Sequence, residues 1–177
     1  MALDKKEKAI ELQGITKTFG SVVANDHINL EVRRGEILAL LGENGSGKTT
    51  LMNMISGIYH PDEGTIKING KEVTINSPID AGKLGIGMIH QHFKLVDVFS
   101  AMDNVAMGME GKRVKPKELK EKLTKLTEKY GLEVEPEKKI YNMSVSEKQT
   151  VEILKVLYRN ADILILDEPT AVLTPQE

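Results

Sequence analysis

The segment from Gly42 to Thr49 has the residue types and spacing of a phosphate-binding loop. It matches the pattern G-x-x-x-x-G-K-[ST] at every fixed position. Glycines let backbone N–H groups curve around phosphate oxygens, and a following helix adds its partial positive charge. Lys48 would reach the β- and γ-phosphates, and the Thr49 hydroxyl would ligate Mg²⁺. The alternative is a glycine turn without a ligand. The residues predicted to contact nucleotide are Gly42, Glu43, Asn44, Gly45, Ser46, Gly47, Lys48, Thr49 and Thr50.

Two carboxylates follow an apolar run near the other end of the sequence. Ile163 to Leu166 are apolar, and Asp167 and Glu168 come directly after them. A buried strand here would deliver Asp167 to the carboxyl edge of a sheet, where it would organise the Mg²⁺ shell. Glu168 is placed to orient or deprotonate the water that attacks the γ-phosphate. Alone, the pair is equally typical of a helix N-terminus; together with the glycine-rich loop it predicts nucleotide hydrolysis.

Composition excludes several other classes of protein. The 177 residues include 24 Lys/Arg and 26 Asp/Glu, a formal net charge of -2, and no cysteine. The near-zero balance argues against a broad basic surface, so we expect no nucleic-acid partner. No apolar run approaches the roughly 20 residues of a membrane helix, and the N-terminus lacks the apolar region of a secretory signal. We therefore expect a cytoplasmic chain that reaches a membrane only through a partner.

Apolar patterns place strands and helices in alternation along the chain. Strand patterns cover residues 9–15, 27–33, 36–41, 64–70, 85–90 and 161–169, and helical patterns cover 48–56, 119–130 and 144–160. Residues 36–41 and 163–166 are continuous apolar runs, the pattern of strands buried on both faces. The alternation implies an α/β fold with a lysine-rich helical insertion. We predict a core of residues 1–95 and 161–177 and a helical subdomain of about 96–160. The lysines would form a solvated face, with a lipid or acidic-partner surface as the alternative.

Other classes of phosphate-loop protein fit poorly. The sequence has no N-K-x-D or D-x-x-G segment of the kind that a guanine-specific GTPase uses. Its four arginines are too few for the arginine-lined lid of a small nucleotide kinase. The GTPase and kinase hypotheses are therefore disfavoured.

The order of motifs resembles the ATP-binding domain of ABC transporters. The motifs are Phe19, the loop at 42–49, Gln91, a signature-like segment at 143–149 and LILDEP at 164–169. The resemblance implies an α/β P-loop NTPase of the ABC ATPase type, with a β-rich N-terminal part and a helical subdomain. It also implies that Phe19 stacks on adenine and that Gln91 contacts Mg²⁺ and water as a catalytic residue. A core position is the alternative for Phe19.

A narrower resemblance rests on the amino-acid segment around Gln91 and on the last 27 residues. MIHQHFKLV and VEILKVLYRNADILILDEPTAVLTPQE are similar to bacterial simple-sugar and nucleoside importer ATPases, in the branch with basic-membrane-protein-type receptors. The resemblance implies a membrane permease, a second ATP-binding domain in a head-to-tail dimer and, indirectly, a solute-binding receptor. It places the chain at the inner face of the cell membrane. Phe93, Leu95 and Phe99 would meet the permease, with a covered core as the alternative.

The signature-like segment departs from the family pattern. Ser144, Ser146 and Glu147 stand where this branch has L-S-V-G-E, so Ser146 replaces a glycine, and Thr150 replaces an arginine. In the family this loop caps the nucleotide on the opposite subunit, and a Cβ at Ser146 would obstruct close backbone approach. The alternative for Ser144-x-x-Glu147 is a helix capping box, and the two roles are compatible.

The chain also lacks a counterpart to the family's switch histidine, since all four histidines precede Glu168. We expect the front of an ABC domain, C-terminally incomplete, with exposed apolar surface and marginal stability. ATP-driven import of nucleosides or sugars is the predicted role. A non-hydrolysing nucleotide-binding fragment or degenerate copy is the main alternative, and a soluble ABC protein of translation or repair is a third.

Overall fold

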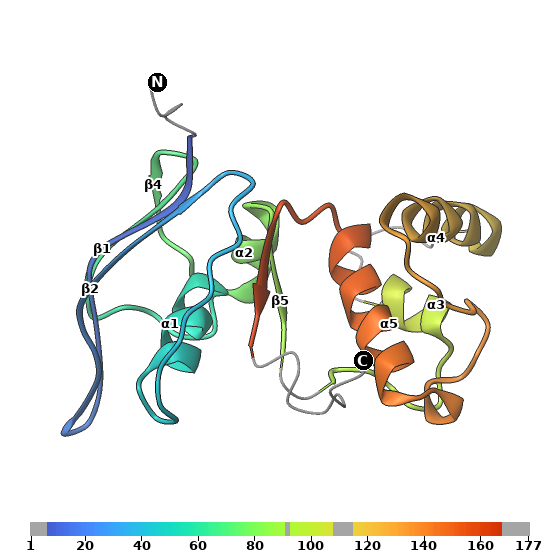
Figure 1. The fold of residues 1–177 in the computed structure, drawn as a ribbon, viewed down its shortest axis with the longest axis horizontal. Coiled ribbons are helices and arrows are strands. Elements are labelled where there is room, and N and C mark those ends of the chain that lie inside the picture. The colour runs from blue at the N-terminus through green and yellow to red at the C-terminus, as the bar shows by residue number, and fades with distance from the viewer. Residues whose placement is uncertain (1–6, 91–92, 108–114, 168–177) are drawn as a thin grey trace. The chain divides into compact units, whose positions relative to one another are not determined.

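Figure 1 shows a computed structural model of the chain, in which residues 7–90, 93–107 and 115–167 are described. The fold mixes strands and helices, as predicted. The chain divides into two compact units, Met1–Ile86 and Gly87–Glu177. The predicted helical subdomain of about 96–160 contains the three helices of the second unit, but its limits and those of the core stay a prediction.

The first unit is built on an antiparallel sheet of four strands. Its strands are β1 (Lys8–Phe19), β2 (Val22–Arg33), β3 (Glu63–Ile68) and β4 (Lys71–Val73), in the order β2-β1-β3-β4. A two-residue loop joins β1 to β2, and Gly20 adopts the positive φ of 60° that such a tight turn requires. Most buried side chains of the sheet are aliphatic, among them Ile10, Leu12, Ile15, Ile66 and Ile68.

Two helices belong to the same unit. Helix α1 (Lys48–Ile55) buries Leu51, Met54 and Ile55, which recur at the spacing of one helical face. Gly57 follows the helix with a φ of 79°, and a Cβ there would collide with the backbone of Ser77. Ser77 caps helix α2 (Pro78–Lys83) by accepting the Asp80 N–H at 3.2 Å.

The strand predicted over residues 36–41 is absent from the structure. These residues have no regular secondary structure, and the side chains of Ile37 and Leu41 are 99% and 94% exposed. A strand buried on both faces needs backbone partners, and within the described ranges no strand pairs with this segment. The prediction of a buried strand was therefore wrong for this structure, while the expected exposed apolar surface is confirmed.

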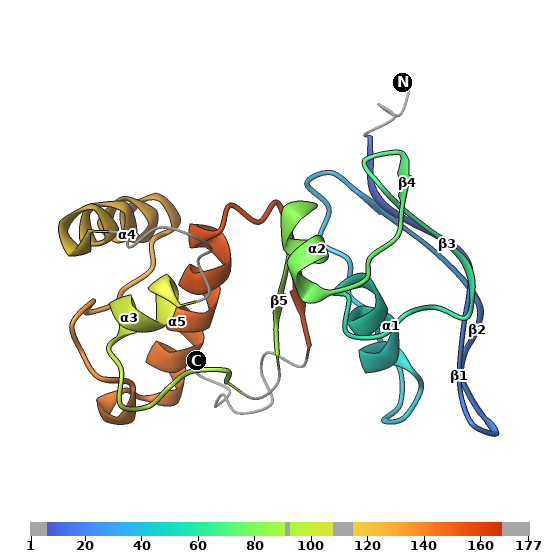
Figure 2. The same cartoon turned by 180° about the vertical axis from the view of Figure 1, so that it is seen from behind.

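The second unit packs three helices around an apolar core. The helices are α3 (Ala101–Ala106), α4 (Pro116–Tyr130) and α5 (Val145–Tyr158), with a short 3₁₀ helix, η1 (Ile140–Asn142), between the last two. Figure 2 shows α3, α4 and α5 gathered together. The shared core consists of Ala101, Val105, Leu119, Leu123, Ile140, Met143, Val151, Leu154 and Tyr158. None of the helices in the described part of the chain is long and apolar enough to cross a membrane.

A second, two-stranded sheet joins β5 (Ile86–Ile89) to β6 (Ile163–Leu166). The backbone N–H of Asp167 donates to Ile89 O at 3.2 Å, so the carboxyl ends of both strands lie side by side. In β6 only Ile165 is buried, whereas Leu164 and Leu166 are each more than two-fifths exposed. The strand was predicted correctly. The prediction that both of its faces are buried was wrong, because Leu164 and Leu166, which share one face, are exposed.

Candidate nucleotide-binding site

The glycine-rich loop leads directly into helix α1. Ser46 N–H donates to Glu43 O at 3.2 Å, and Gly45 and Gly47 have φ values of 84° and 85°. Side chains rarely adopt these backbone angles, which explains the glycines. The residues from Gly42 to Ser46 are all exposed. The loop therefore presents its backbone to solvent, as a ligand-binding loop must.

Gly47 is the N-cap of α1 and lies against strand β2. No side chain caps the helix from this position. A Cβ on Gly47 would collide with Ala24 O, so a glycine is required by space as well as by φ. Asn25 donates from Nδ2 to Gly47 O at 3.3 Å, while its buried Oδ1 has no hydrogen-bond partner among the described residues. Strand β2 thus fixes the start of the helix.

Lys48 folds back over the loop. Its Nζ donates to Gly42 O and Glu43 O, both at 2.8 Å, and to Ser46 Oγ at 3.3 Å. The ammonium therefore lies at the concave side of the loop, where phosphate oxygens could replace these carbonyl acceptors. Together with the exposed backbone and the helix N-terminus, this donor set fits a polyphosphate.

Phe19 is exposed rather than part of a core. It is the last residue of β1, and its side chain is 43% exposed. Its ring forms an edge-to-face pair with Tyr59, with centroids 5.2 Å apart and an interplanar angle of 71°. The Lys17 ammonium lies 5.5 Å from the centroid of the Phe19 ring. The core alternative for Phe19 is excluded, and stacking of a base on its ring stays a prediction.

Asp167 is buried at the end of β6, in the second unit. The other two residues predicted to act at this edge, Gln91 and Glu168, lie outside the described residues. His90, the residue after β5, has a lowered pKa because burial disfavours its charged form and Lys94 is a nearby cation. The described ranges contain no cluster of three or more acidic or histidine side chains that could hold a metal on its own. The magnesium ligands predicted from the sequence, Thr49, Asp167 and Gln91, stay a prediction.

The signature-like segment forms a capping box at the start of α5. Ser144 Oγ accepts the Glu147 N–H at 3.2 Å, and Glu147 Oε2 accepts the Ser144 N–H at 2.8 Å. Lys138 binds Glu147 at 2.5 Å, and this bond and then the Ser144 N–H lower the pKa of Glu147. Ser146 lies in the first helical turn, so no positive φ is required of it here. The capping alternative is confirmed, and the role toward a partner's nucleotide stays a prediction.

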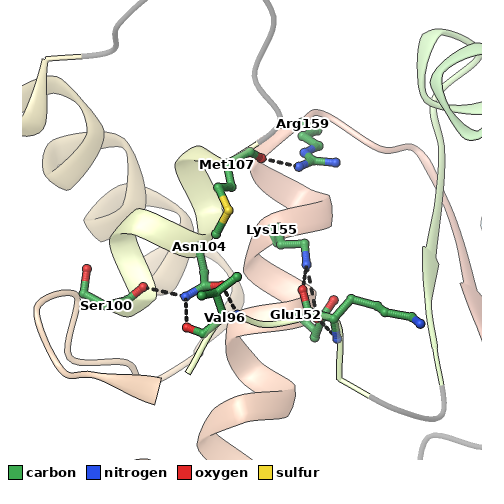
Figure 3. Close-up of polar contacts among 8 residues, drawn as sticks. Val96, Ser100, Asn104, Met107, Glu152, Lys155 and Arg159 are labelled. Atoms are coloured by element: carbon green, nitrogen blue, oxygen red, sulfur yellow. Dashed lines mark hydrogen bonds and ion pairs between the residues drawn. The ribbon is translucent and has the colours of Figure 1, made fainter. Parts of the chain in front are cut away.

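Two buried polar residues hold the segment that follows Gln91 and His92, and the sequence reasoning missed both. In Figure 3, Asn104 lies between Val96 and Ser100: its Oδ1 accepts the Val96 N–H at 2.7 Å, and its Nδ2 donates to Val96 O and Ser100 O. Glu152 accepts the Lys94 N–H at 2.7 Å and pairs with Lys155, which donates to Lys94 O. A glutamate inside the apolar run of α5 was the only signal in the sequence.

The apolar residues predicted to meet a permease are divided between the two alternatives. Leu95 packs against the helical core, and Phe93 is half-buried. Phe99 is exposed, together with its neighbours Val96 and Val98. Part of the segment is therefore a covered core, and part of it is open to a partner.

Three features define a nucleotide-binding protein of the P-loop class. They are a glycine-rich phosphate loop that opens a helix, an exposed aromatic ring in the same unit, and a buried aspartate that ends a strand. The sequence model of the ABC transporter family matches residues 25–171. The chain belongs to the ABC transporter family.

Two of the similar proteins are named as ATP-binding proteins of nucleoside or guanosine import. The chain is 55% identical to the nucleoside import ATP-binding protein NupA of Lactococcus lactis subsp. cremoris and 53% identical to the guanosine import ATP-binding protein NupO of Bacillus subtilis. It is 43% identical to the ribose import ATP-binding protein RbsA of Caldanaerobacter subterraneus subsp. tengcongensis. These alignments cover 97% of this chain and 34–35% of each relative. The chain thus spans about a third of the length of these relatives.

Solved structures of ABC cassettes share the fold. The ADP conformation of the cassette MJ1267 matches with a TM-score of 0.84 at 26% identity, covering 96% of this chain and 72% of that one. CbiO1 of Clostridium perfringens matches with a TM-score of 0.82 at 29% identity, covering 97% and 69%. A dimeric cassette, MJ0796 bound to ADP and Pi, matches with a TM-score of 0.75 at 25% identity, covering 94% and 77%. The likeness extends across both units of the chain.

Proposed function

We propose that this chain is the ATP-binding and ATP-hydrolysing part of a bacterial ABC importer for nucleosides or simple sugars. The observation that carries the proposal is the loop in which Lys48 lies over Gly42 and Glu43 at the uncapped start of α1. The names of the relatives NupA, NupO and RbsA support nucleoside or sugar import.

In this proposal different residues bind the phosphates, the base and the metal ion of ATP and activate the attacking water. The backbone of residues 42–50 and the Lys48 ammonium hold the phosphates, and Phe19 stacks on the base. Thr49, Asp167 and Gln91 would hold Mg²⁺, which neutralises charge on the β- and γ-phosphates when bound. Glu168 orients the attacking water and accepts its proton. Ser144, Ser146 and Glu147 act on the nucleotide of the partner domain.

The partners follow from the same proposal. A second ATP-binding domain completes a head-to-tail dimer, as the dimeric state of the cassette MJ0796 suggests. A membrane permease docks at the exposed residues Val96, Val98 and Phe99 and holds the chain at the inner face of the membrane. A solute-binding receptor acts only indirectly, through the permease.

The test is equilibrium binding and turnover of ATP with Mg²⁺ by the chain and its variants. Lys48→Ala should abolish binding, whereas Lys117→Ala, on the exposed face of α4, should leave it unchanged. Glu168→Gln should retain binding and lose turnover. ATP binding without turnover by the unsubstituted chain would favour the non-hydrolysing alternative, and absence of binding would overturn the proposal.

A further inference from the structure

Tyr59 contacts Phe19 from a segment that is itself anchored on the phosphate-loop helix. The backbone N–H groups of Ile58 and Tyr59 both donate to Asn53 O in α1, at 2.8 and 3.1 Å. The same helix begins at Lys48. The position of the Tyr59 backbone is therefore set by the helix that carries the phosphate-binding residues.

The same segment also holds the strand end that bears Phe19. Asp62 accepts hydrogen bonds from Lys17 Nζ at 2.7 Å, from Thr18 N–H at 2.7 Å and from Thr18 Oγ at 2.8 Å. Its own N–H donates to Thr16 O at 2.8 Å. Four hydrogen bonds thus fix the last residues of β1 to the segment from Tyr59 to Asp62.

Within the segment from Tyr59 to Asp62, Tyr59 contacts the Phe19 side chain itself, whereas Asp62 binds the strand that carries Phe19. Phe19 lies at the tip of a hairpin with nearly half of its side chain exposed. Besides Tyr59, the Lys17 ammonium lies near its ring, 5.5 Å from the centroid. The edge-to-face geometry at 5.2 Å is a favoured arrangement for two aromatic rings and restricts the plane of both. It leaves the exposed part of Phe19 available to a flat ligand.

We propose that Tyr59 is a positioning residue that fixes the plane of Phe19 for stacking of a nucleotide base, at a fixed distance from the phosphate loop. This inference rests on the proposed function, because it takes Phe19 as the base-stacking residue. In this inference Tyr59 contributes to the affinity for the base of the nucleotide and does not contribute to the affinity for its phosphates.

The test compares ATP with inorganic tripolyphosphate, which has the phosphates and lacks the base, in equilibrium binding to the full chain with Mg²⁺. Tyr59→Ala should weaken ATP binding by about 3- to 10-fold, the worth of an aromatic pair. It should change tripolyphosphate binding by less than about 2-fold, since no contact to phosphate is lost. Tyr59→Phe should restore ATP affinity because it keeps the ring. Tyr141→Ala, an exposed tyrosine in the second unit, is the matched control.

A double substitution separates an action through Phe19 from a direct contact with the base. If Tyr59 acts through Phe19, Tyr59→Ala should not weaken ATP binding further in a Phe19→Ala background. Equal losses for ATP and tripolyphosphate, an additive double variant or an unchanged ATP affinity would each overturn the inference while leaving the proposed function intact. Failure of the unsubstituted chain to bind either ligand would overturn the proposed function and this inference with it.

Discussion

The carboxylate of Glu152 accepts a hydrogen bond from the backbone N–H of Lys94, 58 residues earlier in the chain, at 2.7 Å. The glutamate is only 2% exposed, and its charge is balanced by Lys155. Lys155, which lies beside Glu152 in Figure 3, also donates to Lys94 O, so the N–H and the C=O of Lys94 are both held. The segment that follows Gln91 and His92 is therefore attached to the helix that starts at the signature-like residues.

Removing this carboxylate should loosen the second unit. Glu152→Ala leaves the Lys94 N–H without its acceptor and the Lys155 ammonium without its carboxylate partner, at a cost of about 1–3 kcal/mol. Hydrogen exchange at the Lys94 amide should accelerate, and Glu121→Ala on the exposed face of α4 should leave it unchanged. A Glu152→Ala chain with wild-type exchange at Lys94 would contradict the assignment.

Asn104 should be equally intolerant of an apolar replacement. Asn104→Leu keeps the approximate volume but leaves the Val96 N–H without its acceptor in a site that is 1% exposed. It also removes the Nδ2 donor to Val96 O and Ser100 O, which keep their backbone donors Phe99 N–H and Asn104 N–H. We expect a loss of about 1–3 kcal/mol in the free energy of unfolding of this unit. Urea unfolding measures it, with Asn142→Leu as an exposed control. Equal stability of the two variants would show that the three bonds contribute nothing net.

Substitutions at two glycines of the phosphate loop distinguish the cost of backbone strain from the cost of a steric collision. Both have positive φ, but a Cβ on Gly45 would meet no atom within 4 Å, whereas one on Gly47 would collide with Ala24 O. Gly45→Ala should cost about 1–2 kcal/mol from its backbone conformation alone. Gly47→Ala should cost about 1–3 kcal/mol more because of the collision. Thermal unfolding of the two variants checks the order, and a Gly45→Ala chain as unstable as Gly47→Ala would refute the distinction.

Asp62 should make stability depend on acid pH. Hydrogen bonds from Lys17 and then from Thr18 lower the pKa of Asp62 from its ordinary value of 3.8 to about 2. Because the folded pKa lies below the unfolded one, the stabilisation is complete above about pH 4 and is lost as pH falls toward 2. The difference in melting temperature between the unsubstituted chain and Asp62→Asn should therefore be constant above that window and shrink within it. A difference that stays constant down to pH 2 would count against these hydrogen bonds.

The sequence predicted the residues whose chemistry is local and missed those whose partners are distant. The glycine-rich loop and the Ser144–Glu147 capping box are spacings of a few residues, and the structure has both. Tyr59, Asn104 and Glu152 act on a ring or on backbone groups that the sequence does not place near them. The apolar pattern of residues 36–41 indicated two covered faces, but it does not say which strands must cover them, and the described residues supply none.

The uncovered run from Ile37 to Leu41 sets a limit on how this chain behaves at high concentration. Its residues are apolar and uncharged, and within the described residues no strand pairs with their backbone groups. Copies of the chain should therefore self-associate through this run as concentration rises. The run ends directly before Gly42, so such self-association would bring neighbouring copies against the phosphate loop and compete with ligand for access to it.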